Sequence, residues 1–147
     1  MFQFSDSDFS RIEHVLEGKF EKEDDSCYRM VIQNTEEKRK LSFEIYPDIC
    51  IGKSKGNLIS VYTSTSHLQL QFCSGYVVSD MLGEVTFVSE CGSKLSGLII
   101  EKGAACSLYA NLDRDILSGD FTQLGPEVML SGIALSLIDP MLGEENE

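Results

Sequence analysis

The residues from Leu58 to Ser79 constrain the fold more than any other part of the chain. This run of twenty-two residues has no charged side chain and is rich in β-branched and aromatic residues, a composition typical of strands. Side chains of a strand alternate between its two faces. The apolar positions are odd-numbered at Ile59 and Val61 but even-numbered at Leu68 and Phe72. The buried face therefore changes phase, which a single flat strand cannot do.

The phase change falls within Thr63 to His67. Either this segment is a short hairpin loop, or a bulge there redirects one long bent strand. Typical loop lengths favour the hairpin, although Ser and Thr are weaker turn formers than Gly or Asn. A bulge would instead present His67 at a cleft. Whichever of the two is formed, a pocket under the curved sheet is a candidate ligand site, lined by Ser60, Tyr62, Ser64 and His67.

Elsewhere, turn signals recur at intervals of about ten residues, which indicates an antiparallel meander and not alternating βαβ units. Period-two alternation predicts a hairpin from Cys27 to Ile45 around a polar turn at Thr35 to Lys38, interrupted at Pro47 and Asp48. Loops are predicted at Glu21–Ser26 and Gly52–Asn57. Later strands are predicted at Val85–Ser89, Leu95–Ile100 and Ala105–Ala110.

A helix is predicted near each end of the chain. Apolar residues recur at helical spacing behind capping candidates at Ser5 to Ser7, which predicts a helix over Ser7–Glu17 with His14 on its exposed side. Val128 to Ile138 is almost wholly apolar and follows a proline suited to a first helical turn. We interpret it as a helix. A buried pair of strands is the alternative, because its internal glycine costs a helix about 1 kcal/mol.

Together these patterns predict an α+β fold. We expect a curved, mostly antiparallel β-sheet of six to eight strands, with the N-terminal and C-terminal helices packed on one face. Residues 1–142 should form one domain, and residues 143–147 an acidic disordered tail. The predicted core comprises Phe9, Ile12, Leu16, Met30, Ile32, Phe43, Ile45, Leu70, Phe72, Phe87, Ile100, Leu108, Val128, Ile133 and Leu137.

Charge is distributed unevenly along the chain, whose net charge is −12. Residues 1–50 hold 12 acidic and 7 basic side chains, residues 51–100 hold 3 of each, and residues 101–147 hold 9 acidic and 2 basic. Such a surface repels nucleic acid and anionic membranes and attracts basic partners. The predicted partner-binding residues belong to the acidic segments on either side of the neutral sheet: Glu23, Asp24, Asp25, Asp113, Asp115 and Asp120.

No motif for metal, cofactor or catalysis is present. The Cys and His spacings do not match a zinc site, the acidic segment after the last strand lacks the register of a calcium loop, and the glycines form no phosphate loop. A Ser or Cys nucleophile would need a base, and only His14 and His67 are available.

The five cysteines are an odd, widely spaced set, which predicts buried reduced thiols. The N-terminal residues show no basic region followed by an apolar stretch, and no window is apolar enough to span a membrane, so we expect a cytoplasmic protein without a signal peptide.

Residues 111–135, NLDRDILSGDFTQLGPEVMLSGIAL, have the character of a family signature. In length, acidity and lack of catalytic motifs, the whole chain resembles the immunity proteins of bacterial polymorphic and contact-dependent growth-inhibition toxins. Those proteins neutralise a cognate toxin domain, often a basic nuclease, by binding it. The resemblance implies a non-enzymatic inhibitor that binds a basic toxin domain. Two alternatives remain: a small-ligand-binding protein or enzyme with a pocket near His67, and an adaptor subunit of a larger complex.

Overall fold

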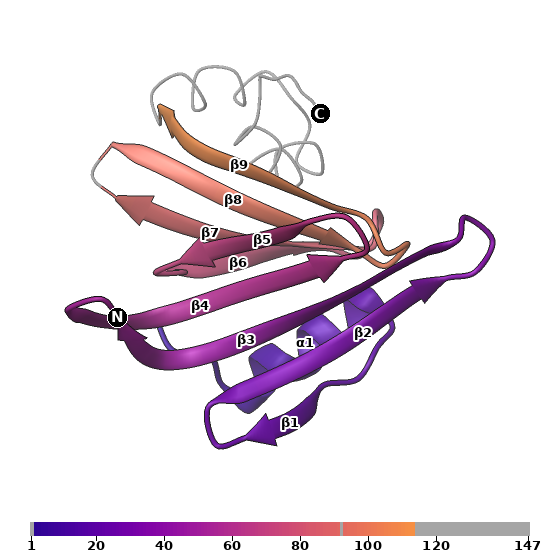
Figure 1. The fold of residues 1–147 in the computed structure, drawn as a ribbon, viewed down its shortest axis with the longest axis horizontal. Helices are drawn as coiled ribbons and strands as arrows, with labels where there is room; N and C mark the ends of the chain where they lie inside the picture. The colour runs from indigo at the N-terminus through magenta and orange to yellow at the C-terminus, as the bar shows by residue number, and fades with distance from the viewer. Residues whose placement is uncertain (1, 92, 114–147) are drawn as a thin grey trace.

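The computed structural model describes residues 2–91 and 93–113. In these residues one helix precedes nine strands, which form two antiparallel sheets in the orders β1-β2-β3-β4-β5 and β6-β7-β8-β9 (Figure 1). The elements are α1 (Asp6–Leu16), β1 (Glu21–Asp24), β2 (Cys27–Asn34), β3 (Arg39–Ile51), β4 (Ser54–Thr63), β5 (His67–Gln71), β6 (Gly75–Ser79), β7 (Glu84–Cys91), β8 (Lys94–Glu101) and β9 (Cys106–Asp113).

The α+β content and the antiparallel pairing agree with the prediction, but the sheet organisation differs from it. The strands are divided between two sheets, and the described residues contain nine strands where six to eight were expected. One of the additional strands is β1, because Glu21–Asp24 pairs with β2 where a charged loop was predicted. The predicted C-terminal helix at Val128–Ile138 and the predicted tail at 143–147 lie outside the described residues.

The helix α1 is held by a reciprocal cap at its first turn. The Ser5 hydroxyl accepts from the Asp8 N–H, and the Asp8 carboxylate accepts from the Ser5 N–H at 2.8 Å, so each residue's side chain bonds to the backbone of the other. Glu17 ends the helix in the left-handed conformation, with φ of 56°. The helix is shifted by one residue from the predicted Ser7–Glu17, and His14 is exposed as predicted.

The segment Thr63 to His67 is a hairpin loop, which confirms the favoured interpretation. The Thr63 N–H donates to the Ser66 carbonyl at 2.9 Å. The Thr63 hydroxyl accepts from the N–H groups of Thr65 and Ser66, at 3.2 and 2.9 Å. Hydroxyl side chains thus provide local bonds that stabilise a turn without Gly or Asn. The buried face changes phase because the chain reverses, so that Tyr62 faces His67 across the ladder.

Pro47 and Asp48 interrupt the ladder without ending the strand. The register of β3 shifts between Tyr46 and Ile49, and Asp48 adopts φ of 51°. Proline has no N–H to donate to the ladder. A bulge therefore accommodates Pro47 without the loss of a backbone hydrogen bond that Pro47 could have formed. The next connection is only Gly52 and Lys53, so the predicted loop over Gly52–Asn57 was too long.

The chain leaves the first sheet at Phe72, which has φ of 58°. Asn57 of β4 is buried beside this crossover and donates from Nδ2 to the carbonyls of Cys73 and Phe2, at 3.1 and 3.0 Å. Its Oδ1 accepts from the Asp48 N–H at 3.0 Å. The prediction that Phe72 is a core residue was wrong, because its side chain is 41% exposed. The left-handed backbone turns the ring outward after β5 has ended.

The core lies between the inner faces of the sheets and beneath α1. The rings of Phe43 and Phe87, both fully buried, join the two sheets with centroids 6.1 Å apart. In Figure 1, α1 runs behind β2 and β3, and it also approaches β6 and β7. The predicted core residues that are buried are Ile12, Leu16, Met30, Ile32, Phe43, Ile45, Leu70, Phe87 and Ile100. Phe9 and Leu108 are partly buried against this core, and Val128, Ile133 and Leu137 lie outside the described residues.

Candidate functional site

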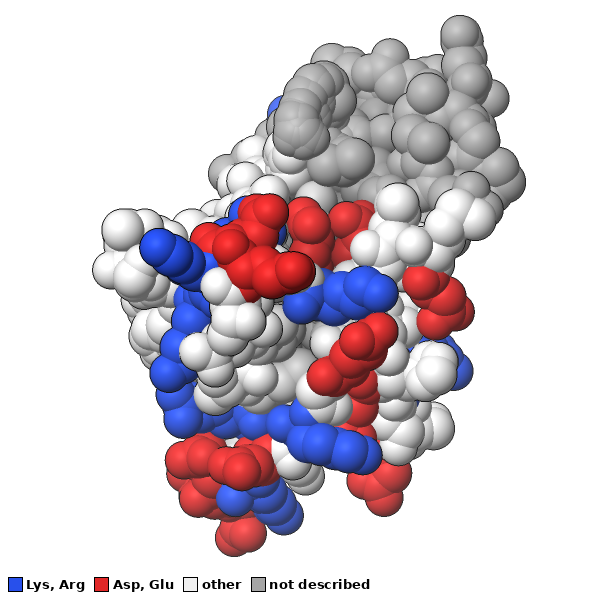
Figure 2. Space-filling model, turned by 90° about the vertical axis from the view of Figure 1, so that its right-hand side faces the viewer, with Lys and Arg blue, Asp and Glu red and all other residues white. Residues whose placement is uncertain are grey.

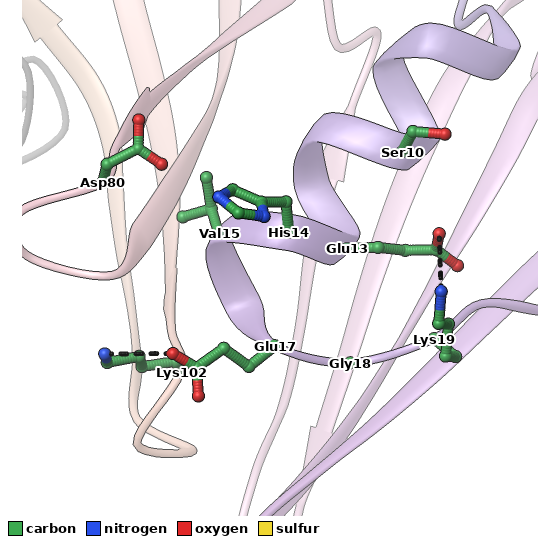
Figure 3. A pocket seen from close by; sticks show the side chains of 9 residues that line it. All are labelled: Ser10, Glu13, His14, Val15, Glu17, Gly18, Lys19, Asp80 and Lys102. Carbon is green, nitrogen blue, oxygen red and sulfur yellow. Dashed lines mark hydrogen bonds and ion pairs between the residues drawn. The ribbon is translucent and has the colours of Figure 1, made fainter.

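A polar hollow of about 670 Å³ lies beside the C-terminal half of α1 (Figure 3). Helical spacing places Glu13, His14 and Glu17 at its edge, because residues three and four apart share a face. Asp80 enters from the turn between β6 and β7, and Lys102 from the turn between β8 and β9. The hollow therefore collects charged side chains from three separate parts of the chain.

Two ion pairs border this hollow. Glu17 contacts Lys102 at 3.3 Å and Glu13 contacts Lys19 at 4.0 Å. Pairs this exposed contribute at most about 1 kcal/mol each. In Figure 3 the His14 ring extends toward the side that carries Asp80, whereas Ser10 points away from it. A serine nucleophile and a histidine base are therefore not placed together here, and the arrangement is better suited to binding than to covalent chemistry.

The structure brings together three of the four residues predicted to line a pocket. Ser60 Oγ and His67 Nε2 lie 2.8 Å apart. The Tyr62 and His67 rings stack with centroids 4.3 Å apart and planes 9° apart. They share the face of β4 and β5 opposite to the buried Ile59 and Val61. This cluster therefore lies on the outer face of the first sheet. Ser64 lies apart from it, in the loop.

The contact between Ser60 and His67 has the elements of a nucleophile and a base. However, Ser60 is only 1% exposed, so its hydroxyl is covered by its neighbours. Among the described residues, no carboxylate hydrogen-bonds to the imidazole of His67, so the third group of a catalytic triad is missing there. The exposed part of the cluster is the stacked pair of rings.

The acidic residues predicted to bind a partner lie at two distant edges. Glu23 and Asp24 are in β1 and Asp25 is in the following turn, all exposed. Hydrogen bonds from the Ser26 N–H and hydroxyl lower the pKa of Asp24. Asp113 ends β9, the outer strand of the second sheet, and Figure 1 shows β1 and β9 at opposite ends of the molecule. Asp115 and Asp120 lie outside the described residues.

Acidic and basic side chains are interspersed on the face drawn in Figure 2, without a continuous acidic patch. Residues 1–113 contain 17 acidic and 11 basic side chains, so they carry half of the net charge of −12. Among the described residues, no group of three or more His, Cys, Asp or Glu side chains is arranged to hold a metal ion.

The cysteines described by the structure are free thiols. Cys27 and Cys73 are buried and Cys106 is partly buried, but the prediction of buried thiols was wrong for Cys50, which is exposed. Burial raises the pKa of Cys73 to about 11 and also raises the pKa of Cys27 and of Cys106. A thiol with a raised pKa stays protonated near neutral pH and is a poor nucleophile.

The sequence predictions missed a basic hollow of about 450 Å³. It lies where Lys38, Arg39 and Lys40 approach the loop from Thr63 to Ser66. Three consecutive basic residues in an acidic chain could have indicated a basic site. That the loop from Thr63 to Ser66 lies beside these residues was not predictable, because the loop is more than twenty residues further along the chain.

Neither a protein-family model, nor a curated protein, nor a solved structure matches the chain. In the part of the chain that the structure describes, no helix is long and apolar enough to cross a membrane. A functional proposal for this protein therefore depends on its own surface and contacts.

Proposed function

We propose that this chain is a non-enzymatic, cytoplasmic binding protein that docks a basic protein partner along the acidic edge of its first sheet. In its most specific form, it is an immunity-type inhibitor that neutralises a basic toxin domain. The observation that carries the proposal is β1. This strand forms the edge of its sheet, all four of its side chains are exposed, and three of them are acidic.

An edge strand has backbone donors and acceptors available for an added strand. β1 pairs with β2 along one side, and no other described strand pairs with its outer side. Charged residues on such an edge prevent indiscriminate pairing, but they also select a partner of opposite charge. Residues 21–25 contain four acidic side chains and one basic side chain. A basic partner would be attracted to this edge before contact, and its charges would orient it there.

The test is co-purification with a basic protein encoded by the adjacent gene, followed by affinity measurements. The variant Glu23→Lys/Asp25→Lys should weaken binding by about tenfold or more, chiefly through the association rate. Raising the salt concentration should weaken wild-type binding, because exposed charges are screened beyond about 8 Å at physiological ionic strength. The same charge reversal at Asp113, Asp115 and Asp120 measures the contribution of the second acidic segment.

A matched control is Glu36→Lys/Asp80→Lys, which makes an equal change in net charge at two other exposed turns. This control should reduce binding much less. If both double variants weaken binding equally, attraction depends on total charge and docking at β1 is wrong. Binding that does not respond to salt would remove the electrostatic mechanism.

The stacked pair Tyr62 and His67 favours a second candidate function, recognition of a small planar ligand. Tyr62 is 39% exposed, and its ring lies nearly parallel to that of His67. An exposed aromatic face can stack on a flat ring, and the imidazole can hydrogen-bond to the ligand. A panel of metabolites should then contain a compound that raises the melting temperature of the wild type but not of His67→Ala. Equal shifts in both proteins would eliminate this candidate.

A further inference from the structure

Three turns meet around the basic hollow and form its walls. The first is the β2–β3 turn with the start of β3, which supplies Lys38, Arg39 and Lys40. The second is the β4–β5 loop, Thr63 to Ser66, and the third is the β8–β9 turn at residues 104–106. The hollow is thus built from both sheets. It lies at the end of β2 remote from β1, so it is separate from the proposed partner edge.

Hydrogen bonds between the sheets join the first of these turns to the third. Arg39 donates from Nε to the Gly103 carbonyl at 3.2 Å, and Asn34 donates from Nδ2 to the same carbonyl at 3.2 Å. Arg39 Nη1 also contacts the Glu37 carboxylate at 3.0 Å. These contacts use two of the five N–H donors of Arg39, so three remain available for a ligand. The guanidinium is therefore already positioned before any ligand binds.

The hollow presents further donors without a protein partner. Among the described residues, neither Lys38 nor Lys40 forms an ion pair, and the hydroxyl groups of Ser64 and Thr65 make no hydrogen bond. The Thr63 and Ser66 hydroxyl groups bond to each other at 2.8 Å, which stabilises the loop that carries the free hydroxyls. Ammonium, guanidinium and neutral hydroxyl donors thus line the same hollow.

We infer that this hollow binds a small anion that carries phosphate groups. Phosphate oxygens accept several hydrogen bonds each and suit both a guanidinium fork and lysine ammonium groups. Glu37 already pairs with Arg39, so its charge is partly neutralised. The volume of about 450 Å³ is large enough for a chain of linked phosphates as well as a single one. A phosphate site here would need no glycine-rich loop, because side chains supply the donors.

Isothermal titration with tripolyphosphate, at constant ionic strength, tests this inference on the full chain. We expect binding of one tripolyphosphate per chain, tighter than binding of inorganic phosphate or citrate. Each of Lys38→Gln and Lys40→Gln should weaken binding roughly two- to fivefold, as expected for exposed ion pairs. The double variant should weaken it by about tenfold. Thermal unfolding of each variant, without ligand, verifies that it is folded.

The control variant is Lys53→Gln/Lys55→Gln, which removes the same number of charges at the β3–β4 hairpin. It should bind tripolyphosphate as the wild type does. The inference is overturned if this control weakens binding as much as Lys38→Gln/Lys40→Gln. It is also overturned if the wild type shows no saturable binding, or if citrate binds as tightly as tripolyphosphate.

Discussion

The Tyr76 hydroxyl donates a 2.6 Å hydrogen bond to Oδ1 of Asp8, which connects the first strand of the second sheet to the first turn of α1. Arg11 donates to the same hydroxyl from Nη1 at 3.2 Å. Asp8 also accepts from the Ser5 N–H in the helix cap. The phenol therefore joins the capping network of the helix to the sheet.

Tyr76→Phe should lower the free energy of unfolding by about 1–2 kcal/mol, because the charge-assisted bond to Asp8 is lost while the ring is kept. Urea unfolding measures the change. Tyr62→Phe is the matched control, since the Tyr62 hydroxyl makes no hydrogen bond among the described residues. An equal loss in both variants would show that the bond to Asp8 contributes nothing specific.

Burial, and then the hydrogen bond to Asp8, raise the pKa of Tyr76 to about 12 from an ordinary value of 10. The fold thus favours the neutral phenol. Its contribution to stability is present below pH 10 and is lost as the pH rises through about 12. Phenolate absorbance after rapid pH jumps measures how many tyrosines ionise at each pH. Compared with the wild type, Tyr76→Phe should lack one tyrosine that ionises near pH 12. If it instead lacks one that ionises near pH 10, the prediction is contradicted.

Burial opposes the ionisation of Asp8, but hydrogen bonds from Tyr76 and Ser5 outweigh it and lower the pKa below the ordinary 3.8. The stabilisation is present above pH 3.8 and is lost as the pH falls through the lower folded-state pKa. Asp8→Asn should therefore be less stable than the wild type at pH 7, and the difference should shrink at acid pH. Urea unfolding at both pH values measures this. A difference that does not depend on pH would contradict the assignment.

Asn57→Ala should destabilise the protein by about 3 kcal/mol, because the buried Asn57 amide bonds to backbone groups of Phe2, Asp48 and Cys73, and all three lose this partner. Urea unfolding measures the loss. The exposed Gln69→Ala on the neighbouring strand should change stability by less than about 0.5 kcal/mol. A loss below about 1 kcal/mol at Asn57 would show that water replaces the missing amide.

Cys50 should react with a thiol reagent much faster than Cys73 in the native protein. Cys50 is exposed, whereas Cys73 is 3% exposed and burial raises its pKa to about 11. Peptide mapping after brief labelling distinguishes the two sites. In denaturant both should react at similar rates, which shows that the native difference comes from the fold. Early labelling of Cys73 would mean that the crossover beside it opens readily.

Much of the local structure was predictable because it depends on neighbours in the sequence. Alternation located the strands on both sides of the turns, and helical spacing located α1 with His14 outside. The phase change between Val61 and Leu68 required a reversal, and the hydroxyl groups near it can stabilise one. The same alternation places Ser60 and Tyr62 on one face, so their proximity to His67 follows from the hairpin.

The division into two sheets depended on contacts that local patterns do not contain. Phe72 continues the apolar alternation of β5, yet it turns outward because Asn57, fifteen residues earlier, holds the crossover. The same limit applies to the basic hollow, where Arg39 reaches Gly103 from 64 residues away in the sequence.

The sequence by itself therefore determined the helix α1, most of the described strands and which face of most of them is apolar, since these follow from backbone geometry and side-chain period. Only the tertiary structure decided where the sheet divides and which charged side chains share a hollow. Hydrogen bonds such as those of Asn57 and Arg39 join residues that the chain brings together only after it has folded.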